Sequence, residues 1–337
     1  MSATARPGPR NLITDVAGIA VGNADDATVR TGVTVVLPDR PCVAAVDVRG
    51  GGTGSRELAL LDPTGMVQKV DALVLSGGSA FGLDAAGGAM SWLAACDRGF
   101  PIRGGDAIVP IVPQAILFDL LNGGDKRAFR DPTGAGLPYR HLAKAACDTA
   151  GAHFALGNTG AGFGAKAGSL KGGLGSASVA LANGTTVGAL AAVNSHGETT
   201  YADGTFLAWD SAIGDEMGGL APTGQPQLLT MSEDGDPAAN TTLAVVATDL
   251  ALTRADAQRV AVMAQDGFAR AIRPVHTPFD GDTVFVLSTG VRPLADPAVE
   301  VARIGAAAAD CVARAIARGV HAAATLGSMA GWRDRFG

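Results

Sequence analysis

The sequence predicts a globular protein of the α/β class, and three observations support this prediction. Of the 337 residues, 47% are hydrophobic, 17% are charged and only 5% are aromatic, so small aliphatic side chains and glycine must form the core. Short β-branched runs end in glycine clusters, and one of them leads directly into an Ala-rich helical segment. The last third of the chain alternates strand, helix, strand and helix, which is typical of an α/β fold.

Two β-branched runs near the N-terminus predict a hairpin. They cover residues 32–37 and 42–48, and Pro38-Asp39-Arg40-Pro41 joins them.

The next predicted strand, 72–75, passes through the turn Ser76-Gly77-Gly78 into a helix over about 80–95. The N–H groups of such a turn lie at a helix N-terminus, which makes the turn a candidate anion or oxyanion site. Tight packing that only glycine allows is the alternative explanation.

The middle of the chain predicts one helix and one hairpin before it becomes polar. The helix covers 139–150, and the strands 175–181 and 185–193 flank Asn183-Gly184, a dipeptide typical of hairpin turns. Residues 210–240 are rich in Gly, Pro and acidic side chains without periodicity, so we expect a long exposed loop and the best candidate for a chain boundary.

The last third begins with a β run over 241–248. Thr253 to Asp256 has the form of a capping box, which predicts a helix over about 255–272. A strand at 284–287 follows, and Asp296-Pro297 then opens a final helix with an N-cap and a proline at the first helical position.

Charge and cysteine content exclude several classes of function. The net charge is -6 and no block of Lys or Arg occurs, so we expect no nucleic-acid partner. The four cysteines are scattered without a CxxC pair, which favours a reducing compartment and no metal site. No apolar stretch approaches the ~20 residues of a membrane span, and the first ten residues lack an apolar signal core. The sequence therefore predicts a cytoplasmic protein with no membrane association and no cofactor.

The pair Asp280-Gly281-Asp282 is a candidate for acid–base chemistry. Two carboxylates at i and i+2 around a glycine can approach one point, where they could orient a hydroxyl, share a proton or bind a metal. A simple turn before the following strand is the alternative explanation. The sequence contains no GxSxG, HExxH or GxxxxGK[ST] motif that would indicate a conventional site.

The tripeptide Asn240-Thr241-Thr242 lies at the end of the polar segment and directly before a β run. If the Thr241 hydroxyl attacks the preceding peptide bond, an acyl shift and hydrolysis leave Thr241 with a free α-amine. That amine has a reference pKa of about 7.7–8.0 and can act as the base for its own hydroxyl. The start of an ordinary strand is the alternative explanation.

Several segments together carry a family resemblance. In chain order they are Asn11 to Gly22, Asp47 to Gly52, Leu75 to Ala86, Lys171 to Gly175, Asn194, Asn240 to Thr242 and Asp280 to Asp282. In this combination the chain resembles the DmpA-type self-cleaving aminopeptidase family, and within it the branch that includes the nylon-oligomer hydrolases. The resemblance runs from about Asn11 to Ala323.

The resemblance implies an αββα sandwich of the type shared with ornithine acetyltransferase. It also implies self-cleavage into a large subunit, 1–240, and a small subunit, 241–337, that stay together as one structural domain. By the same resemblance Thr241 is the nucleophile, Asn194 stabilises the oxyanion, and the pair Asp280 and Asp282 orients the Thr241 hydroxyl.

The resemblance extends to a lysine, to the substrate pocket and to assembly. The nylon hydrolases place a catalytic lysine where this chain has Ser169, with Lys166 and Lys171 on either side. Lys171 is our candidate, although a solvent-facing position is the default expectation for each lysine. We expect Ser79 and Phe81 to contribute to the pocket, and the family to assemble as a homo-oligomer, a tetramer.

The function that follows is a self-processing amide hydrolase, an aminopeptidase or amidase acting on small peptides or amide oligomers. An acyltransferase of the same fold is one alternative, in which an amine competes with water for the acyl-enzyme. A binding protein that keeps the fold and never cleaves is the other.

Overall fold

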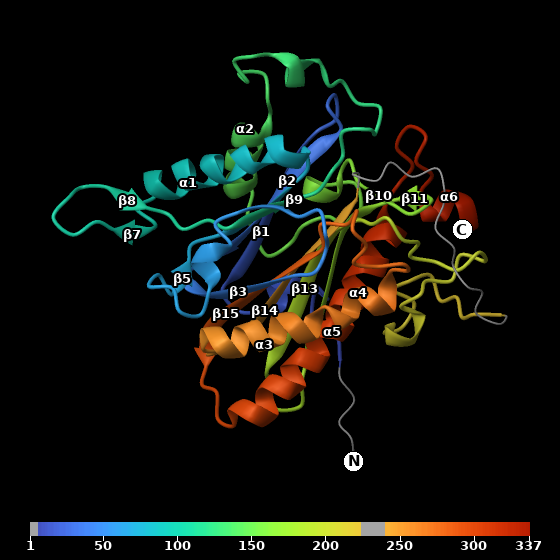
Figure 1. Cartoon of the computed structure of the whole chain (residues 1–337). Coiled ribbons are helices and arrows are strands. Elements are labelled where there is room, and N and C mark those ends of the chain that lie inside the picture. The colour runs from blue at the N-terminus through green and yellow to red at the C-terminus, as the bar shows by residue number, and fades with distance from the viewer. Residues whose placement is uncertain (1–5, 224–239) are drawn as a thin grey trace.

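Two β-sheets stack face to face at the centre of the molecule, and helices cover both outer faces (Figure 1). The computed structural model describes residues 6–223 and 240–337. Helices α1 (Ala85–Ala95) and α2 (Tyr139–Asp148) lie over the first sheet, and the helices of the last third lie over the second. The four layers form the αββα sandwich, so the predicted fold class is confirmed.

The first sheet is built from the N-terminal part of the chain, in the strand order β1–β2–β6–β9–β4. Its strands are β1 (Ile19–Asp26), β2 (Thr31–Pro38), β4 (Gly54–Arg56), β6 (Leu73–Ser76) and β9 (Gln114–Ile116).

The second sheet combines strands from both ends of the chain, in the order β12–β13–β14–β15–β3–β5. Its strands are β3 (Cys42–Val48), β5 (Lys69–Val70), β12 (Gly173–Ala180), β13 (Thr186–Asn194), β14 (Thr241–Leu250) and β15 (Thr283–Arg292). Strands β14 and β15 are parallel, as expected for strands that a helical crossover connects. All ten residues of the central strand β14 are buried.

Three apolar clusters fill the spaces between the layers. The cluster between the sheets includes Val36 and Leu75 from the first sheet and Leu243 and Phe285 from the second. A second cluster joins the first sheet to α1 and α2, and the largest joins the second sheet to the C-terminal helices. Because each sheet is covered on both faces, strands such as β2 and β14 are buried along their whole length rather than on alternate residues.

The C-terminal helices are α3 (Arg254–Ala264), α4 (Asp266–Ala271), α5 (Pro297–Ala322) and the short α6 (Trp332–Phe336). The predicted caps are confirmed, since Thr253 forms a capping box with Asp256 and the Asp296 carboxylate accepts a hydrogen bond from the Val299 N–H. The prediction of one continuous helix over 255–272 is wrong, because the chain forms two helices there, α3 and α4, separated at Gln265. Gly267 there packs so closely that a Cβ would lie 2.4 Å from the Ala309 carbonyl oxygen of α5.

The hairpin predicted from 32–37 and 42–48 is also wrong. Strand β2 pairs with β1 and β6, whereas β3 pairs with β15 and β5, so Pro38 to Pro41 carries the chain from one sheet to the other. The hairpin around Asn183-Gly184 is confirmed as the antiparallel pair β12 and β13. The helix expected over 139–150 is confirmed as α2, and 80–95 forms a 3₁₀ turn that leads into α1.

Glycines allow the long helix α5 to approach the second sheet. A Cβ on Gly175 of β12 would lie 1.9 Å from the Ala315 carbonyl oxygen, which shows that the helix rests on the strand backbone. The small-residue core expected from composition therefore serves a close contact between a helix and a sheet.

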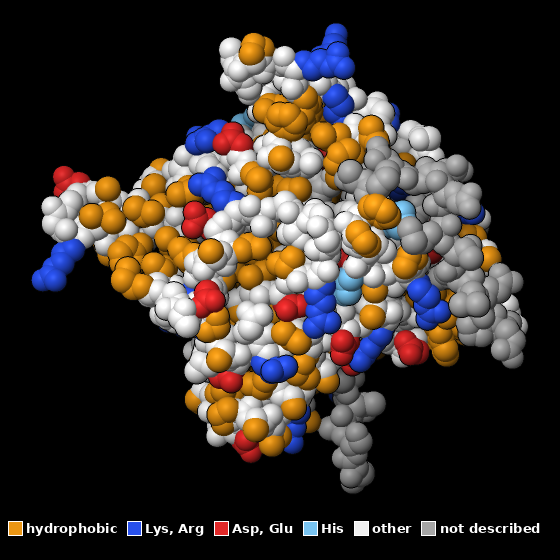
Figure 2. Space-filling view, viewed as in Figure 1, with side chains coloured by type: hydrophobic (Ala, Val, Ile, Leu, Met, Phe, Trp, Pro, Cys, Tyr) orange, Lys and Arg blue, Asp and Glu red, His pale blue; other side chains and the backbone are white. Residues whose placement is uncertain are grey.

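Two further two-stranded pairs extend from the sandwich. Strands β10 (Lys166–Ala167) and β11 (Leu170–Lys171) lie beside the end of β13. Strands β7 (Phe100–Pro101) and β8 (Ile108–Val109) form an arm that projects from the body (Figure 1), with hydrophobic side chains along it and charged ones at its tip (Figure 2). Among the described residues, no helix is both long and apolar enough to cross a membrane.

The predicted loop 210–240 falls partly outside the described residues, since 224–239 are not described. The described part, 210–223, has no strand and only the end of a short 3₁₀ turn.

Candidate active site

The pairing of β13 with β14 brings two predicted site residues together. In the antiparallel register, Asn194 at the end of β13 is the partner of Thr241 at the start of β14. Both side chains are buried, each with 2% of its surface exposed. The position of the candidate nucleophile relative to the candidate oxyanion donor is therefore fixed by main-chain pairing in the central sheet.

The Asn240 carbonyl is held by two hydrogen-bond donors. The Thr241 hydroxyl donates to the Asn240 carbonyl oxygen at 2.5 Å, and the Gly281 N–H donates to the same oxygen at 3.2 Å. A Cβ on Gly281 would lie 2.5 Å from Thr241 Oγ1, so only glycine fits between the hydroxyl and the acidic pair. In the intact chain the hydroxyl thus lies against the peptide group that it is expected to attack.

Asp280 is buried and satisfied by donors from two segments. Its Oδ2 accepts hydrogen bonds from the Thr277 N–H at 2.9 Å and the Thr277 hydroxyl at 2.6 Å, and its Oδ1 accepts one from the His196 N–H at 3.2 Å. Burial raises the pKa of the Asp280 carboxyl, and the charge of Asp282 raises it further.

Asp282 connects the nucleophile strand to a histidine. Its Oδ1 accepts a hydrogen bond from the Thr242 N–H at 2.9 Å, while its Oδ2 lies 2.9 Å from His276 Nδ1 and accepts the His276 N–H at 3.1 Å. The two carboxylates flank Gly281, whose N–H binds the Asn240 carbonyl, so the acidic pair lies near the start of β14. That the pair orients the Thr241 hydroxyl stays a prediction.

The Asn194 carboxamide is held at both ends. Its Oδ1 accepts the Lys166 N–H at 2.8 Å, and its Nδ2 donates to the Phe118 carbonyl oxygen at 3.0 Å. A side chain braced in this way loses little conformational entropy when it binds a reacting group.

The two candidate lysines differ sharply in environment. Lys166 is exposed, as expected, and contributes its backbone N–H to Asn194. Lys171 is fully buried, so the default expectation of a solvent-facing side chain is wrong for it. Its Nζ donates to the carbonyl oxygens of Gly162 at 3.0 Å and Gly172 at 2.7 Å. Burial lowers the pKa of Lys171 to about 7, against the opposing charge of Asp119.

The turn Ser76-Gly77-Gly78 binds the protein's own groups. The Gly78 N–H donates to Asp119 Oδ1 at 2.8 Å, and the Gly77 and Ser79 N–H groups donate to the carbonyl oxygens of Gly32 and Leu117. As an oxyanion site for substrate the turn is therefore a wrong prediction, because an internal carboxylate and two carbonyls already occupy its donors.

The segment that follows β9 contacts both the pocket candidate Ser79 and Asn194. Ser79 bonds to the Leu117 carbonyl, and the next carbonyl along that segment, Phe118, accepts from Asn194. Phe81 is 44% exposed and packs edge-on against Phe129 at 5.1 Å between ring centroids. Their place in a substrate pocket stays a prediction.

The sequence analysis missed three contacts around the site. The His196 side chain meets Asn240, the Gly281 N–H binds the Asn240 carbonyl, and His276 contacts Asp282. The short spacing of His196 from Asn194 and the place of Gly281 between two acids were available signals. Their contacts depend on the pairing of distant strands, which no local pattern reveals.

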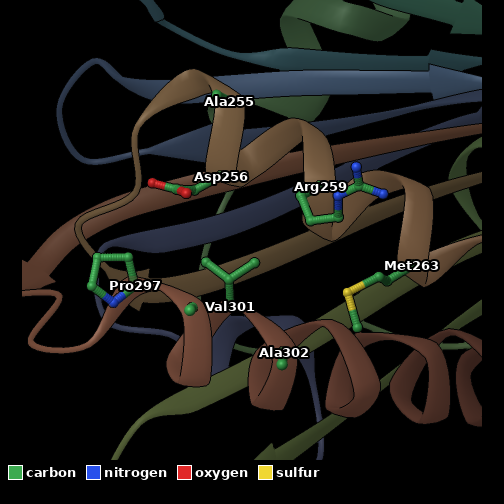
Figure 3. Close-up of a pocket in the computed structure, with 8 residues that line it drawn as sticks. Ala255, Asp256, Arg259, Met263, Pro297, Val301 and Ala302 are labelled. Atoms are coloured by element: carbon green, nitrogen blue, oxygen red, sulfur yellow. The ribbon is translucent and has the colours of Figure 1, made fainter.

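A separate surface hollow of about 410 Å³ lies between α3 and α5 (Figure 3). Its lining includes Ala255, Asp256, Arg259, Met263, Pro297 and Val301. None of the predicted site residues lines it, so we do not connect it with the chemistry at Thr241.

Solved structures show which known fold this sandwich shares. The β-aminopeptidase of a Burkholderia species superposes with a TM-score of 0.71 at 22% identity, covering 100% of this chain and 94% of that chain. The L-aminopeptidase D-Ala-esterase/amidase of Ochrobactrum anthropi, described as a variant of the Ntn hydrolase fold, gives 0.69 at 24%, covering 97% and 90%. The sandwich is thus an N-terminal-nucleophile hydrolase fold.

Sequence comparisons identify the family within that class. The family sequence model described as Peptidase family S58 matches residues 11–333 of this chain. An uncharacterized aminopeptidase of Mycobacterium tuberculosis is 44% identical over 97% of this chain and 98% of its own, and the 6-aminohexanoate-oligomer endohydrolase of a Kocuria species is 27% identical over 84% and 76%. The chain belongs to peptidase family S58 and is a peptide or amide hydrolase, which confirms the resemblance predicted from its motifs.

Proposed function

We propose that the chain cuts itself between Asn240 and Thr241 and that Thr241 then acts as the N-terminal nucleophile of an amide hydrolase. The observation that carries the proposal is the contact of the Thr241 hydroxyl with the Asn240 carbonyl, at 2.5 Å, beside the Gly281 N–H. Ordinary strand starts do not combine a buried hydroxyl, a backbone donor on the preceding carbonyl and two buried carboxylates.

The first reaction is the cut. The Thr241 oxygen attacks the Asn240 carbonyl carbon, and the negative charge that develops on the carbonyl oxygen is stabilised by the Gly281 N–H. The C–N bond then breaks as the hydroxyl proton moves to the Thr241 nitrogen, leaving an ester. Water hydrolyses the ester to the Asn240 carboxylate and a free Thr241 with its hydroxyl and α-amine.

The second reaction repeats this chemistry on a substrate. The α-amine of Thr241 takes the proton of its own hydroxyl, which attacks a substrate amide, and the leaving amine departs with that proton. Asn194 Nδ2 would stabilise the oxyanion, a contribution of typically ~3 kcal/mol. Asp280 and Asp282 would hold the ammonium near the hydroxyl, and water then releases the acid from the acyl-enzyme.

The substrates that we propose are small peptides or amide oligomers. The names of the relatives support this class, since one is a 6-aminohexanoate-oligomer endohydrolase and another an aminopeptidase. Lys171 stays a candidate on the resemblance: burial lowers its pKa to about 7, while its Nζ donates to the carbonyl oxygens of Gly162 and Gly172.

The test is a denaturing gel and intact mass of the purified protein beside Thr241→Ala. Because 97 residues follow the cut, the 33.6 kDa chain should give pieces of about 24 and 10 kDa, the smaller starting at Thr241. Thr242→Val is the matched control, since the Thr242 hydroxyl has no hydrogen-bond partner among the described residues and the substitution keeps its shape. Uncut chain in the wild type after prolonged incubation would contradict the proposal and favour a binding protein.

The proposal includes the organisation of the mature enzyme. We expect 1–240 and 241–337 to remain one structural domain after the cut, because the partners β13 and β14 lie on opposite sides of it and two of the three core clusters draw on both pieces. Assembly into a homo-oligomer and a cytoplasmic location remain predictions.

A further inference from the structure

His196 lies two residues after Asn194. It contacts Asn240, the residue before the proposed cut, and two residues of the smaller piece, Phe279 and Asp280. Its Nδ1 is 3.1 Å from Asn240 Nδ2, a distance at which the amide donates a hydrogen bond when Nδ1 carries no proton. Its N–H donates to Asp280 Oδ1 at 3.2 Å, and its ring packs at 5.7 Å from that of Phe279. Asp280 thus holds the His196 backbone and Phe279 packs against the imidazole that meets Asn240.

The scissile residue is thereby held at two points. The Asn240 carbonyl oxygen is bound by Thr241 Oγ1 and the Gly281 N–H, and its carboxamide is bound by His196. The carbonyl carbon shares a planar peptide group with the Thr241 nitrogen, and this plane can still turn about the Asn240 Cα–C bond. A hydrogen bond to the Asn240 side chain holds the Cα end of that bond and so helps to keep the carbonyl carbon facing the hydroxyl, the condition for attack.

We propose that His196 is a positioning residue for self-cleavage, acting through the side chain of Asn240. This inference rests on the proposed cut between Asn240 and Thr241. In the tautomer that accepts from the carboxamide, Nδ1 is bound to Asn240 and Nε2 carries the ring proton, so neither nitrogen takes the proton of the nucleophile. His196 instead fixes the acyl half of the bond that breaks.

The contact of His196 with Asn240 depends on two separate parts of the second sheet. Asp280 and Phe279 belong to the segment before β15, whereas His196 follows β13, so both parts must be in place for His196 to meet these neighbours.

Two variants distinguish the packing of the His196 ring from the hydrogen bond that its Nδ1 accepts. His196→Phe keeps a ring against Phe279 and removes the acceptor, whereas His196→Asn keeps a polar oxygen near the position of Nδ1 and removes the ring. The measurement is the rate at which the smaller piece appears in a pulse-chase after cell-free synthesis. We expect His196→Phe to cleave about tenfold more slowly, as for the loss of one positioning hydrogen bond, and His196→Asn within about threefold of the wild type.

A double-mutant cycle shows whether the effect passes through Asn240. Asn240→Ala removes the same hydrogen bond from the other side and should slow cleavage by a similar factor, and His196→Phe should add nothing further in that background. Wild-type rates in His196→Phe, or equal slowing by His196→Phe with and without Asn240→Ala, would overturn the role of His196. Thermal unfolding of each variant combined with Thr241→Ala reports whether it folds, and Asn240→Ala alone provides the test if His196→Phe does not.

The outcomes distinguish this inference from the proposed function. A wild-type chain that never cleaves contradicts the proposed function and the role of His196 together. If the wild type cleaves and His196→Phe cleaves at the same rate, only the positioning role of His196 is contradicted.

Discussion

Asn194 and Thr241 are direct partners in the β13–β14 ladder, so main-chain hydrogen bonds set the distance between the two residues. Sites built on strands hold their groups more precisely than sites built on loops. Two hydrogen bonds hold the Asn194 carboxamide in place: it accepts one from the Lys166 N–H and donates one to the Phe118 carbonyl oxygen. The central sheet thus organises the site before any substrate binds.

Replacement of Asn194 by Asp should lower kcat by a factor of about 100 to 1,000 with little change in KM, because it removes the Nδ2 donor from the oxyanion. Asp keeps an oxygen that can accept the Lys166 N–H, so the loop should remain in place. The measurement is kcat on a small amide, normalised to the amount of cut chain. A change of less than threefold would show that another group binds the oxyanion.

Replacement of Gly281 by Ala should abolish the cut while the chain still folds. The new Cβ would lie 2.5 Å from Thr241 Oγ1 and must displace the hydroxyl from the carbonyl that it attacks. Gly105→Ala is the matched control, because a Cβ there meets nothing closer than 3.7 Å. Gel bands and thermal unfolding of both variants test this, and normal cleavage of Gly281→Ala would contradict the geometry.

Local patterns predicted much of this molecule, and non-local pairing accounts for what they missed. The Asn183-Gly184 hairpin and the caps at Thr253 and Asp296 depend on neighbouring residues, and the structure confirms them. The partners of β2 and β3 depend on strands far away in sequence, so the predicted hairpin was wrong.

Burial is likewise invisible to a local pattern. Lys171 is fully buried, and Asp119 binds a glycine turn 41 residues before it, and neither fact can be read from the residues next to them in sequence. The motif residues Thr241, Asp280 and Asp282 could be singled out in the sequence. The donors from His196, Gly281 and His276 that surround them required the fold.

Lys171 should make stability depend on pH. Burial lowers its pKa from the ordinary value of 10.5 to about 7, so the unfolded chain binds a proton between these values that the folded chain does not. Stability from this group therefore rises with pH above 7, by up to about 1.4 kcal/mol per pH unit, and is lost as pH falls toward 7.

Urea unfolding at pH 7.0, 7.75 and 8.5 in the Thr241→Ala background tests this prediction. Lys171→Met should flatten the dependence relative to Lys171, whereas exposed Lys166→Met should leave it unchanged. The window stays below pH 9 because burial raises the pKa of the Cys42 and Cys311 thiols to about 12, which acts with the opposite sign at higher pH. Parallel curves for Lys171 and Lys171→Met would contradict a neutral buried amine.

A buried ion pair should hold the two pieces together after the cut. Glu216 of the large piece binds Arg314 of α5 at 2.6 Å, with 8% and 2% of the side chains exposed, and Arg318 lies 3.6 Å away. Glu216→Gln leaves the Arg314 charge buried without its counter-ion, so we expect a loss of about 3 kcal/mol in the free energy of unfolding.

The matched control for that pair is Asp310→Asn, which breaks the exposed ion pair with Arg270 and should cost less than about 1 kcal/mol. Urea unfolding of both variants with Thr241→Ala gives the free energies, and gel filtration of the cut proteins in increasing urea shows when the pieces separate. Glu216→Gln should release the 10 kDa piece at a lower urea concentration than the wild type or Asp310→Asn. Equal release in all three would mean that the core clusters alone join the pieces, with no contribution from the ion pair.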